Sequence, residues 1–86
     1  MPERRVTVAI AEGLHARPAA LFAKLSAEQP VAVTIRKPDG EPVPASSILR
    51  LMGLGVQAGD EVVLAAEGDE AETSLETLTQ YLATAG

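Results

Sequence analysis

A change of hydrophobic period near residue 13 constrains the fold of this 86-residue chain more than any other feature. Residues 5–10 alternate in a way that suits a half-buried strand. Residues 16–27 are rich in Ala and Leu and contain no Gly, which predicts a helix. Pro18 fits the first turn of that helix, because the N–H that proline lacks has no helical partner there. The rest of the chain is therefore arranged around a strand-to-helix junction at residues 13–19.

The junction holds the only histidine of the chain, His15, at or beside the expected N-cap of the helix. The first turn of a helix exposes unpaired N–H groups and the positive end of the helix dipole, which together attract anions such as phosphate. Arg17 offers a planar, bidentate grip on a phosphoryl group. Gly13 allows the backbone to turn or to approach another segment closely. These residues predict a histidine that accepts a phosphoryl group and holds it at a helix N-terminus.

A capping or surface histidine is the alternative, and the position of His15 alone favours that interpretation. The wider sequence of residues 13–19, Gly-Leu-His-Ala-Arg-Pro-Ala, reverses the preference. It resembles the active-site signature of HPr, the histidine-containing phosphocarrier of the sugar phosphotransferase system. Leu14 stands where either Ile or Leu is usual, and the resemblance extends over essentially the whole chain.

The resemblance implies a phosphoryl carrier protein rather than an enzyme, with no cofactor and no metal. By resemblance, His15 takes a phosphoryl group from Enzyme I, which phosphoenolpyruvate has charged, and carries it on Nδ1 to the IIA domains of sugar permeases. Arg17 stabilises the group in transit. The alternative function is a regulatory binding protein that acts through phosphorylation of Ser47 and through contacts with transcriptional regulators.

A second site is implied at residues 47–55, which resemble the regulatory segment of the family. The match places the regulatory serine at Ser47, the target of an HPr kinase/phosphorylase. The preceding segment is one residue longer than in many relatives, so Ser46 remains an alternative. Either serine is equally explained as a helix N-cap, and the helix dipole also stabilises a phosphate at that position.

The short helix that follows is expected to carry a docking surface for protein partners. Two helical turns cannot bury four large apolar side chains, so some of them should form an exposed patch beside His15, while ordinary core packing accounts for one or two. The expected partner-binding residues are Pro18, Lys24, Ile48, Leu49, Arg50, Leu51 and Met52. Arg50 and Glu12 depart from the small residues common in relatives, and both change the charge around this surface.

The net charge of −5 is unevenly distributed along the chain. All seven Lys and Arg residues lie at or before Arg50, and seven acids and no base follow it. Charge alone favours an ordinary solvated surface, but together with the motif at residues 13–19 it suits the first half to an acidic protein partner. Nucleic acid is not expected as a partner, because there is no basic stripe and there are only two aromatic residues. The absence of Cys excludes disulfides, and no apolar run is long enough for a signal core or a membrane span. We expect one cytoplasmic domain, residues 1–86, that is monomeric.

Periodicity and turn residues divide the remaining chain into short elements. The expected strands are residues 5–10, 31–37, 41–45 and 61–66, and the expected helices are residues 16–27, residues 46–52 and a third that begins at residue 69. Gly53 and Gly55 should end the second helix. Asp69 and Glu72 should form a capping box at the start of the third.

Spacing also predicts which helical side chains are buried. In the first helix, Leu21 and Leu25 with Pro18 should form the buried stripe, and Phe22 should pack at its margin. The third helix should bury Ala71, Leu75, Leu78 and Leu82, which recur at helical spacing.

The order of elements predicts an α+β fold. Strands 5–10 and 31–37 are joined through a helix and should run parallel. Placing strand 61–66 between them makes every neighbouring pair antiparallel, and it leaves strand 41–45, with Pro42 and Pro44, at an edge. The expected architecture is a four-stranded antiparallel sheet of order 1-4-2-3 covered on one face by three helices. This agrees with the open-faced two-layer sandwich that the HPr resemblance implies.

Overall fold

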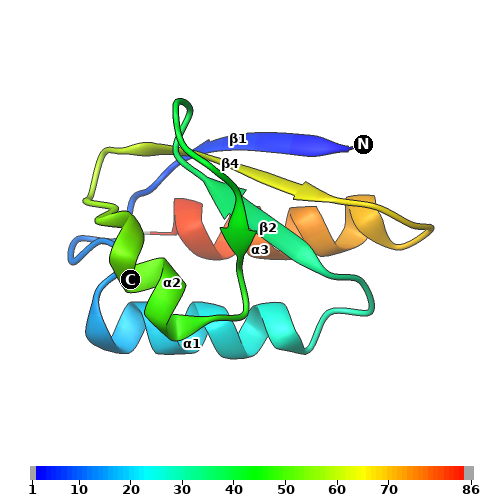
Figure 1. Cartoon of the computed structure of the whole chain (residues 1–86), viewed down its shortest axis with the longest axis horizontal. Helices are drawn as coiled ribbons and strands as arrows, with labels where there is room; N and C mark the ends of the chain where they lie inside the picture. The colour runs from blue at the N-terminus through cyan, green and yellow to red at the C-terminus, as the bar shows by residue number, and fades with distance from the viewer. Residues whose placement is uncertain (1, 85–86) are drawn as a thin grey trace.

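Strands and helices follow one another along the chain in the predicted order. A computed structural model describes residues 2–84 (Figure 1). The elements are β1 (Glu3–Thr7), α1 (Ala16–Ala27), β2 (Val33–Arg36), β3 (Val43–Pro44), α2 (Ile48–Leu54), β4 (Glu61–Ala66) and α3 (Ala71–Ala83). The bounds of α1 and β4 are those predicted, whereas β2 and β3 are shorter and α2 begins two residues later. No helix in the described range combines the length and the apolar character needed to cross a bilayer.

Strand β1 lies nearer the N-terminus than predicted, because the chain leaves the sheet after Thr7. The ladder ends where Thr7 faces Glu61. The Ala9 N–H then donates to the carbonyl of Leu82 in α3, at 2.8 Å, instead of to a strand. Val8 and Ile10 are buried, as the alternation of apolar residues predicted, although both lie beyond the end of the strand.

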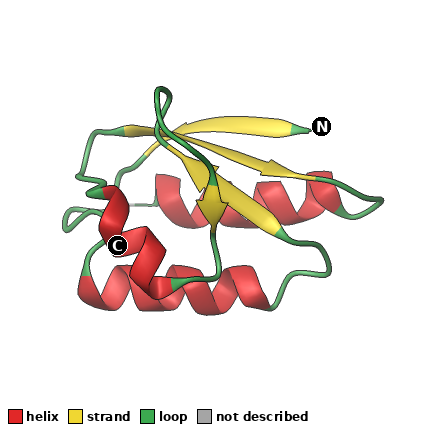
Figure 2. Cartoon of the chain, viewed as in Figure 1, coloured by secondary structure: helices red, strands yellow, loops and turns green. Residues whose placement is uncertain are grey.

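The four described strands form one antiparallel sheet of order β1-β4-β2-β3, as predicted. Figure 2 shows α1, α2 and α3 on the same side of this sheet. Strand β4 lies between β1 and β2, with Val63 opposite Arg5 on one side and opposite Arg36 on the other. Strand β3 is an edge strand, where the missing N–H of Pro44 breaks no ladder.

The open face of the sheet is closed by long charged side chains. Val63 points away from the main core and yet is only 1% exposed. Its two cross-strand neighbours are Arg5 and Arg36, whose long apolar stems cover it. The Arg36 guanidinium donates to the Pro38 carbonyl at 2.8 Å. The Arg5 guanidinium donates to the Glu61 carboxylate at 3.0 Å. This exposed ion pair adds little stability itself, so the main effect of the two arginines is to cover β4.

The buried face of α1 differs from the prediction. Leu21 is 51% exposed and Leu25 is half-buried, whereas Phe22 is fully buried. The core face of the helix consists of Pro18, Ala19, Phe22, Ala23 and Ser26. The Phe22 ring packs against Tyr81 of α3, with ring centroids 5.8 Å apart. Burying this aromatic pair removes more apolar surface from water than burying Leu21 would, so the helix is rotated toward Phe22.

The ends of α2 and α3 also correct the prediction. Gly53 lies inside α2, and the helix ends at Gly55, whose φ of 67° forms a left-handed C-cap with its N–H directed to the Met52 carbonyl. The predicted capping box of α3 is absent, because the helix begins at Ala71 after an N-cap at Glu70 that makes no side-chain bond. The predicted buried face of α3 is confirmed for Ala71, Leu75, Leu78 and Leu82.

Glu72, which was predicted to form the capping box, instead binds Arg4 of β1. The Arg4 guanidinium donates to Glu72 at 2.6 Å and to Glu76, one helical turn away, at 3.1 Å. The hydrogen bond to Glu72 raises the pKa of Arg4 above its ordinary value. This pairing joins β1, at one edge of the sheet, to α3.

The corrected face of α1 can be tested with two neighbouring substitutions. Phe22→Ala should lower the free energy of unfolding by about 3–5 kcal/mol, because it leaves a cavity beside Tyr81. Leu21→Ala should lower it by less than about 1 kcal/mol, because half of that side chain is already in water. Chemical denaturation of both variants measures the difference. Equal losses would mean that both side chains share the core.

Candidate functional site

His15 is the N-cap residue of α1, as predicted. Its backbone is extended, with φ of −121° and ψ of 152°, and its side chain makes no capping hydrogen bond. The residue is half-buried. The imidazole is therefore held beside the positive end of the helix dipole without being used to satisfy the helix. That arrangement leaves a ring nitrogen available to a ligand.

Ala16 makes the turn from loop to helix in a strained conformation. Its φ is 43°, and among residues 2–84 it is the only non-glycine residue with a positive φ. The left-handed region costs an L-residue about 1–2 kcal/mol, so the contacts on both sides must hold Ala16 there. Since Ala16 separates His15 from Arg17, this turn determines how the two side chains are presented.

The loop before His15 is held by a close backbone contact with the segment after α2. Gly13 has a φ of 68°, and a Cβ atom at this residue would lie 2.4 Å from the Val56 carbonyl oxygen. The next amide, of Leu14, donates to the same oxygen at 3.0 Å. Only glycine fits at residue 13, for both its φ and its proximity to Val56. The buried Leu14 side chain fixes the loop from the core side.

Two adjoining hollows surround the start of α1. One, of about 290 Å³, is lined by Glu12, His15, Ala16 and Arg17. The other, of about 370 Å³, is lined by Ile10, Glu12, Arg17, Pro18, Leu21, Tyr81 and Thr84. Arg17 and Glu12 border both, so a bound anion next to His15 meets one cation and one carboxylate. The described residues include no group of three or more His, Asp or Glu side chains able to hold a metal ion.

Tyr81 of α3 supports the first turn of α1. Its hydroxyl donates to the Pro18 carbonyl at 3.1 Å. Burial raises the pKa of the Tyr81 phenol above its ordinary value, so the phenol stays protonated and keeps donating at neutral pH. Sequence patterns gave no indication of this contact, because it joins residues 63 positions apart.

The structure distinguishes the two candidate serines. Ser47 is the N-cap of α2, and its Oγ accepts the Arg50 N–H at 3.3 Å. Ser46 is exposed and precedes the cap. Ser47 is half-buried and its hydroxyl borders the surface, so a capping role and access to a modifying enzyme are compatible.

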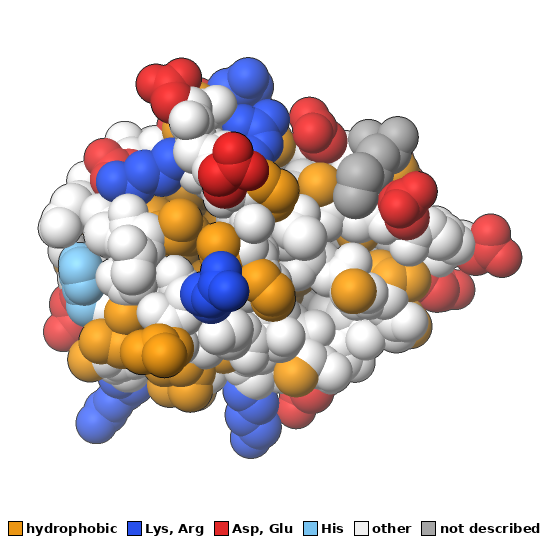
Figure 3. All heavy atoms as spheres, viewed as in Figure 1, with side chains coloured by type: hydrophobic (Ala, Val, Ile, Leu, Met, Phe, Trp, Pro, Cys, Tyr) orange, Lys and Arg blue, Asp and Glu red, His pale blue; other side chains and the backbone are white. Residues whose placement is uncertain are grey.

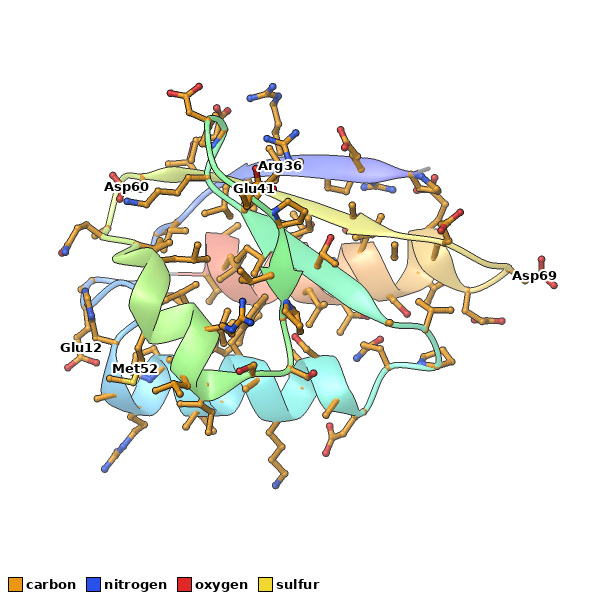
Figure 4. All side chains as sticks on the ribbon, in the orientation of Figure 1. Glu12, Arg36, Glu41, Met52, Asp60 and Asp69 are labelled. Carbon is orange, nitrogen blue, oxygen red and sulfur yellow. The ribbon has the colours of Figure 1, made fainter. Side chains whose placement is uncertain are left out.

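An exposed apolar patch lies beside His15. It consists of Leu21 from α1 and Ile48, Leu49 and Met52 from α2, which are 51%, 46%, 82% and 44% exposed. Figure 3 shows apolar side chains gathered near the histidine, with Lys and Arg side chains projecting around them. Figure 4 places Met52 and Glu12 at the end of the molecule where α1 and α2 meet, far from Asp69.

Two predicted members of the partner surface are in the core instead. Leu51 is fully buried, because it lies on the one face of α2 that packs inward. Pro18 is also buried, on the core face of α1, although it lines the second hollow. Lys24 and Arg50 are exposed. Leu21 belongs to the apolar patch and was missed, since its spacing assigned it to the buried stripe.

Comparisons with known proteins agree on one family. The family described as "PTS HPr component phosphorylation site" matches residues 2–84. "Phosphocarrier protein HPr" of Streptomyces coelicolor is 52% identical over 83 residues, which cover 96% of this chain and 89% of that protein. "HPr-like protein Crh" of Bacillus subtilis is 42% identical over 82 residues, which cover 95% of each. The crystal structure of a phosphocarrier protein HPr from Bacillus anthracis superposes with a TM-score of 0.89 at 38% identity, over 94% of this chain and 95% of that chain.

The strain at Ala16 predicts an unusual response to glycine. Ala16→Gly should leave the free energy of unfolding at or above the wild-type value, because relief of about 1–2 kcal/mol offsets the usual glycine penalty. Ala20→Gly, at an exposed position of the same helix with ordinary geometry, is the matched control and should lose about 1 kcal/mol. Denaturant titration measures both. Equal destabilisation of the two variants would show that Ala16 is not strained.

Proposed function

The chain belongs to the HPr family of phosphocarrier proteins of the sugar phosphotransferase system, and from this we propose that His15 is its phosphoryl acceptor. Members of this family carry a phosphoryl group rather than turn over a substrate. The observation that supports the proposal most is the imidazole of His15, which lies at a helix N-terminus without capping it. Arg17 lines the same surface hollow as His15.

The transfer itself needs few protein groups. Nδ1 of His15 attacks the phosphorus held by Enzyme I, a phosphorus–nitrogen bond forms, and the bond from phosphorus to the donor breaks. Negative charge on the phosphoryl oxygens is stabilised by the Arg17 guanidinium and by the first-turn amides of α1. Positioning and charge stabilisation dominate phosphoryl transfer, so this small set of groups is adequate. Transfer to a IIA domain is the same step with His15 as donor.

We propose that the apolar patch is the shared docking surface for Enzyme I and the IIA domains. Each partner must bring its reacting group to His15, and the patch lies beside it. Lys24 and Arg50 are exposed on the helices that form the patch, so the fitting partner surface is apolar with carboxylates around it. Since both partners use one surface, they bind in turn, within the cytoplasm.

Ser47 is the proposed regulatory phosphorylation site, with Ser46 as the alternative. A phosphate on Ser47 lies at the N-cap of α2, where the dipole stabilises it and the helix remains folded. It adds a charge of about −2 next to a surface suited to acidic partners. Phosphorylation by an HPr kinase/phosphorylase would therefore weaken docking by repulsion.

The second candidate function is a regulatory binding protein. It is favoured by the 42% identity to a protein named "HPr-like protein Crh". In this function the chain acts through Ser47 phosphorylation and contacts a transcriptional regulator with the same apolar patch. Such a protein has no need of His15 and Arg17, so phosphorylation of His15 discriminates the two functions.

The acceptor assignment predicts that His15→Ala abolishes phosphoenolpyruvate-dependent phosphorylation while the fold persists. His15 is the only imidazole of the chain, and its side chain supports no capping bond whose loss would destabilise α1. Intact mass after incubation with Enzyme I and phosphoenolpyruvate, at neutral and at acid pH, reads the acid-labile label. An acid-labile label in the variant at the wild-type rate would eliminate His15 as acceptor.

The regulatory assignment predicts that Ser47→Asp slows association with Enzyme I severalfold at low salt. The difference should fade as salt screens the added charge, while the melting temperature stays near wild type because Asp is a good N-cap. Association rates across a salt series and thermal melting test both parts. Ser46→Asp is the matched control: if it alone slows association, Ser46 is the regulatory position, and if neither variant does, the repulsion mechanism is wrong.

A further inference from the structure

The loop that carries His15 rests on a second loop at both of its ends. At one end Val8 donates its N–H to the Asp60 carbonyl at 2.8 Å and accepts the Gly59 N–H at 2.8 Å. At the other end the Leu14 amide donates to the Val56 carbonyl at 3.0 Å. The position of residues 8–15 therefore depends on how residues 56–60 are held.

Residues 56–60 contain no helix or strand and are closed by one side chain. The Asp60 carboxylate accepts the Gln57 N–H at 2.9 Å. In the opposite direction the Asp60 N–H donates to the Gln57 carbonyl at 3.0 Å. This reciprocal pair fixes Gln57, which follows directly after the Val56 carbonyl that binds Leu14. The side chain of Asp60 is thus linked through Gln57 to the Val56 carbonyl. That carbonyl holds Leu14, the residue before His15.

Lys37, at the end of the β2 ladder, adds a third support to this loop. Its Nζ donates to the Gly55 carbonyl at the C-terminus of α2, at 3.3 Å, and lies 3.9 Å from the Asp60 carboxylate. A cation is favourable at the negative end of a helix dipole. Lys37 therefore joins the end of α2 to the turn that Asp60 closes. Figure 4 shows Asp60 on the side of the molecule where Glu12 and Met52 also lie.

We propose that Asp60 is a positioning residue for His15. Its carboxylate holds Gln57 and Val56, the Val56 carbonyl holds Leu14, and Leu14 sets the backbone from which the imidazole projects. The inference rests on the proposed phosphoryl acceptor role and extends it to a residue that touches neither His15 nor a partner surface. A small displacement of a reacting group lowers a transfer rate steeply, so losing this support should slow transfer without weakening docking.

Asp60→Ala is the decisive variant, studied in the full chain. With the chain as varied substrate of phosphorylated Enzyme I, we expect kcat to fall about tenfold and KM to stay within about twofold, because the apolar patch is untouched. Amide hydrogen exchange at Leu14 should accelerate, since its bond to Val56 opens more often. Asp60→Asn should keep kcat and the exchange rate of the Leu14 amide near their wild-type values, because its amide oxygen still accepts the Gln57 N–H.

Asp69→Ala is the matched control, because it removes the same charge from an exposed loop far from His15 (Figure 4). It should leave kcat and Leu14 exchange at wild-type values. Wild-type kcat in Asp60→Ala, an equal loss in Asp60→Asn, or an equal loss in Asp69→Ala would each overturn the positioning role. If the wild-type chain accepts no phosphoryl group, the proposed function fails instead, and Leu14 exchange in the three variants still decides whether Asp60 holds the loop.

Discussion

Burial of strand β4 on both faces is the constraint on which the rest of this structure depends. Toward the helices, Val62 and Leu64 are covered by the main core; toward water, Val63 is covered by the stems of Arg5 and Arg36. A strand buried in this way needs a neighbour on each edge and one fixed register, because a slip of one residue would exchange its two faces. The register with β1 ends opposite Glu61, and there the chain leaves the sheet to form the loop that carries His15.

The candidate phosphoryl site is built mainly from backbone contacts. The approach of Gly13 to Val56, the left-handed turn at Ala16 and the free first turn of α1 together present one imidazole and one guanidinium. Phosphoryl transfer asks for a positioned nucleophile and fixed dipoles, and backbone groups supply both without many functional side chains. The side chains that matter most after His15 and Arg17 are then those that hold the backbone, and for this reason we propose a role for Asp60.

Charge and apolar surface are separated along the molecule. The apolar patch and the exposed Lys24 and Arg50 belong to α1 and α2, whereas seven acids follow residue 59 and several of them lie on α3 or just before it. Under the docking proposed above, the cations on α1 and α2 favour a partner surface that carries carboxylates. Ser47 caps α2 at the border of that surface, and we propose that a phosphate there weakens docking while the helix stays folded.

The amino-acid sequence alone was enough to predict the order of elements, the proline-bearing edge strand and the place of His15 at a helix start. Each of these follows from local rules of backbone geometry, turn formation and capping. The sequence also indicated that Gly13 allows a turn or a close backbone approach, but the contact with Val56 that requires glycine there comes from the tertiary structure. Tertiary packing places Phe22 rather than Leu21 in the core, buries Leu51 on the inward face of α2, and brings Glu72 to Arg4 instead of to the cap of α3. A sequence pattern shows which residues share a helical face, because residues three or four apart lie on the same side. It does not show which face is buried, since that depends on the elements that pack against the helix.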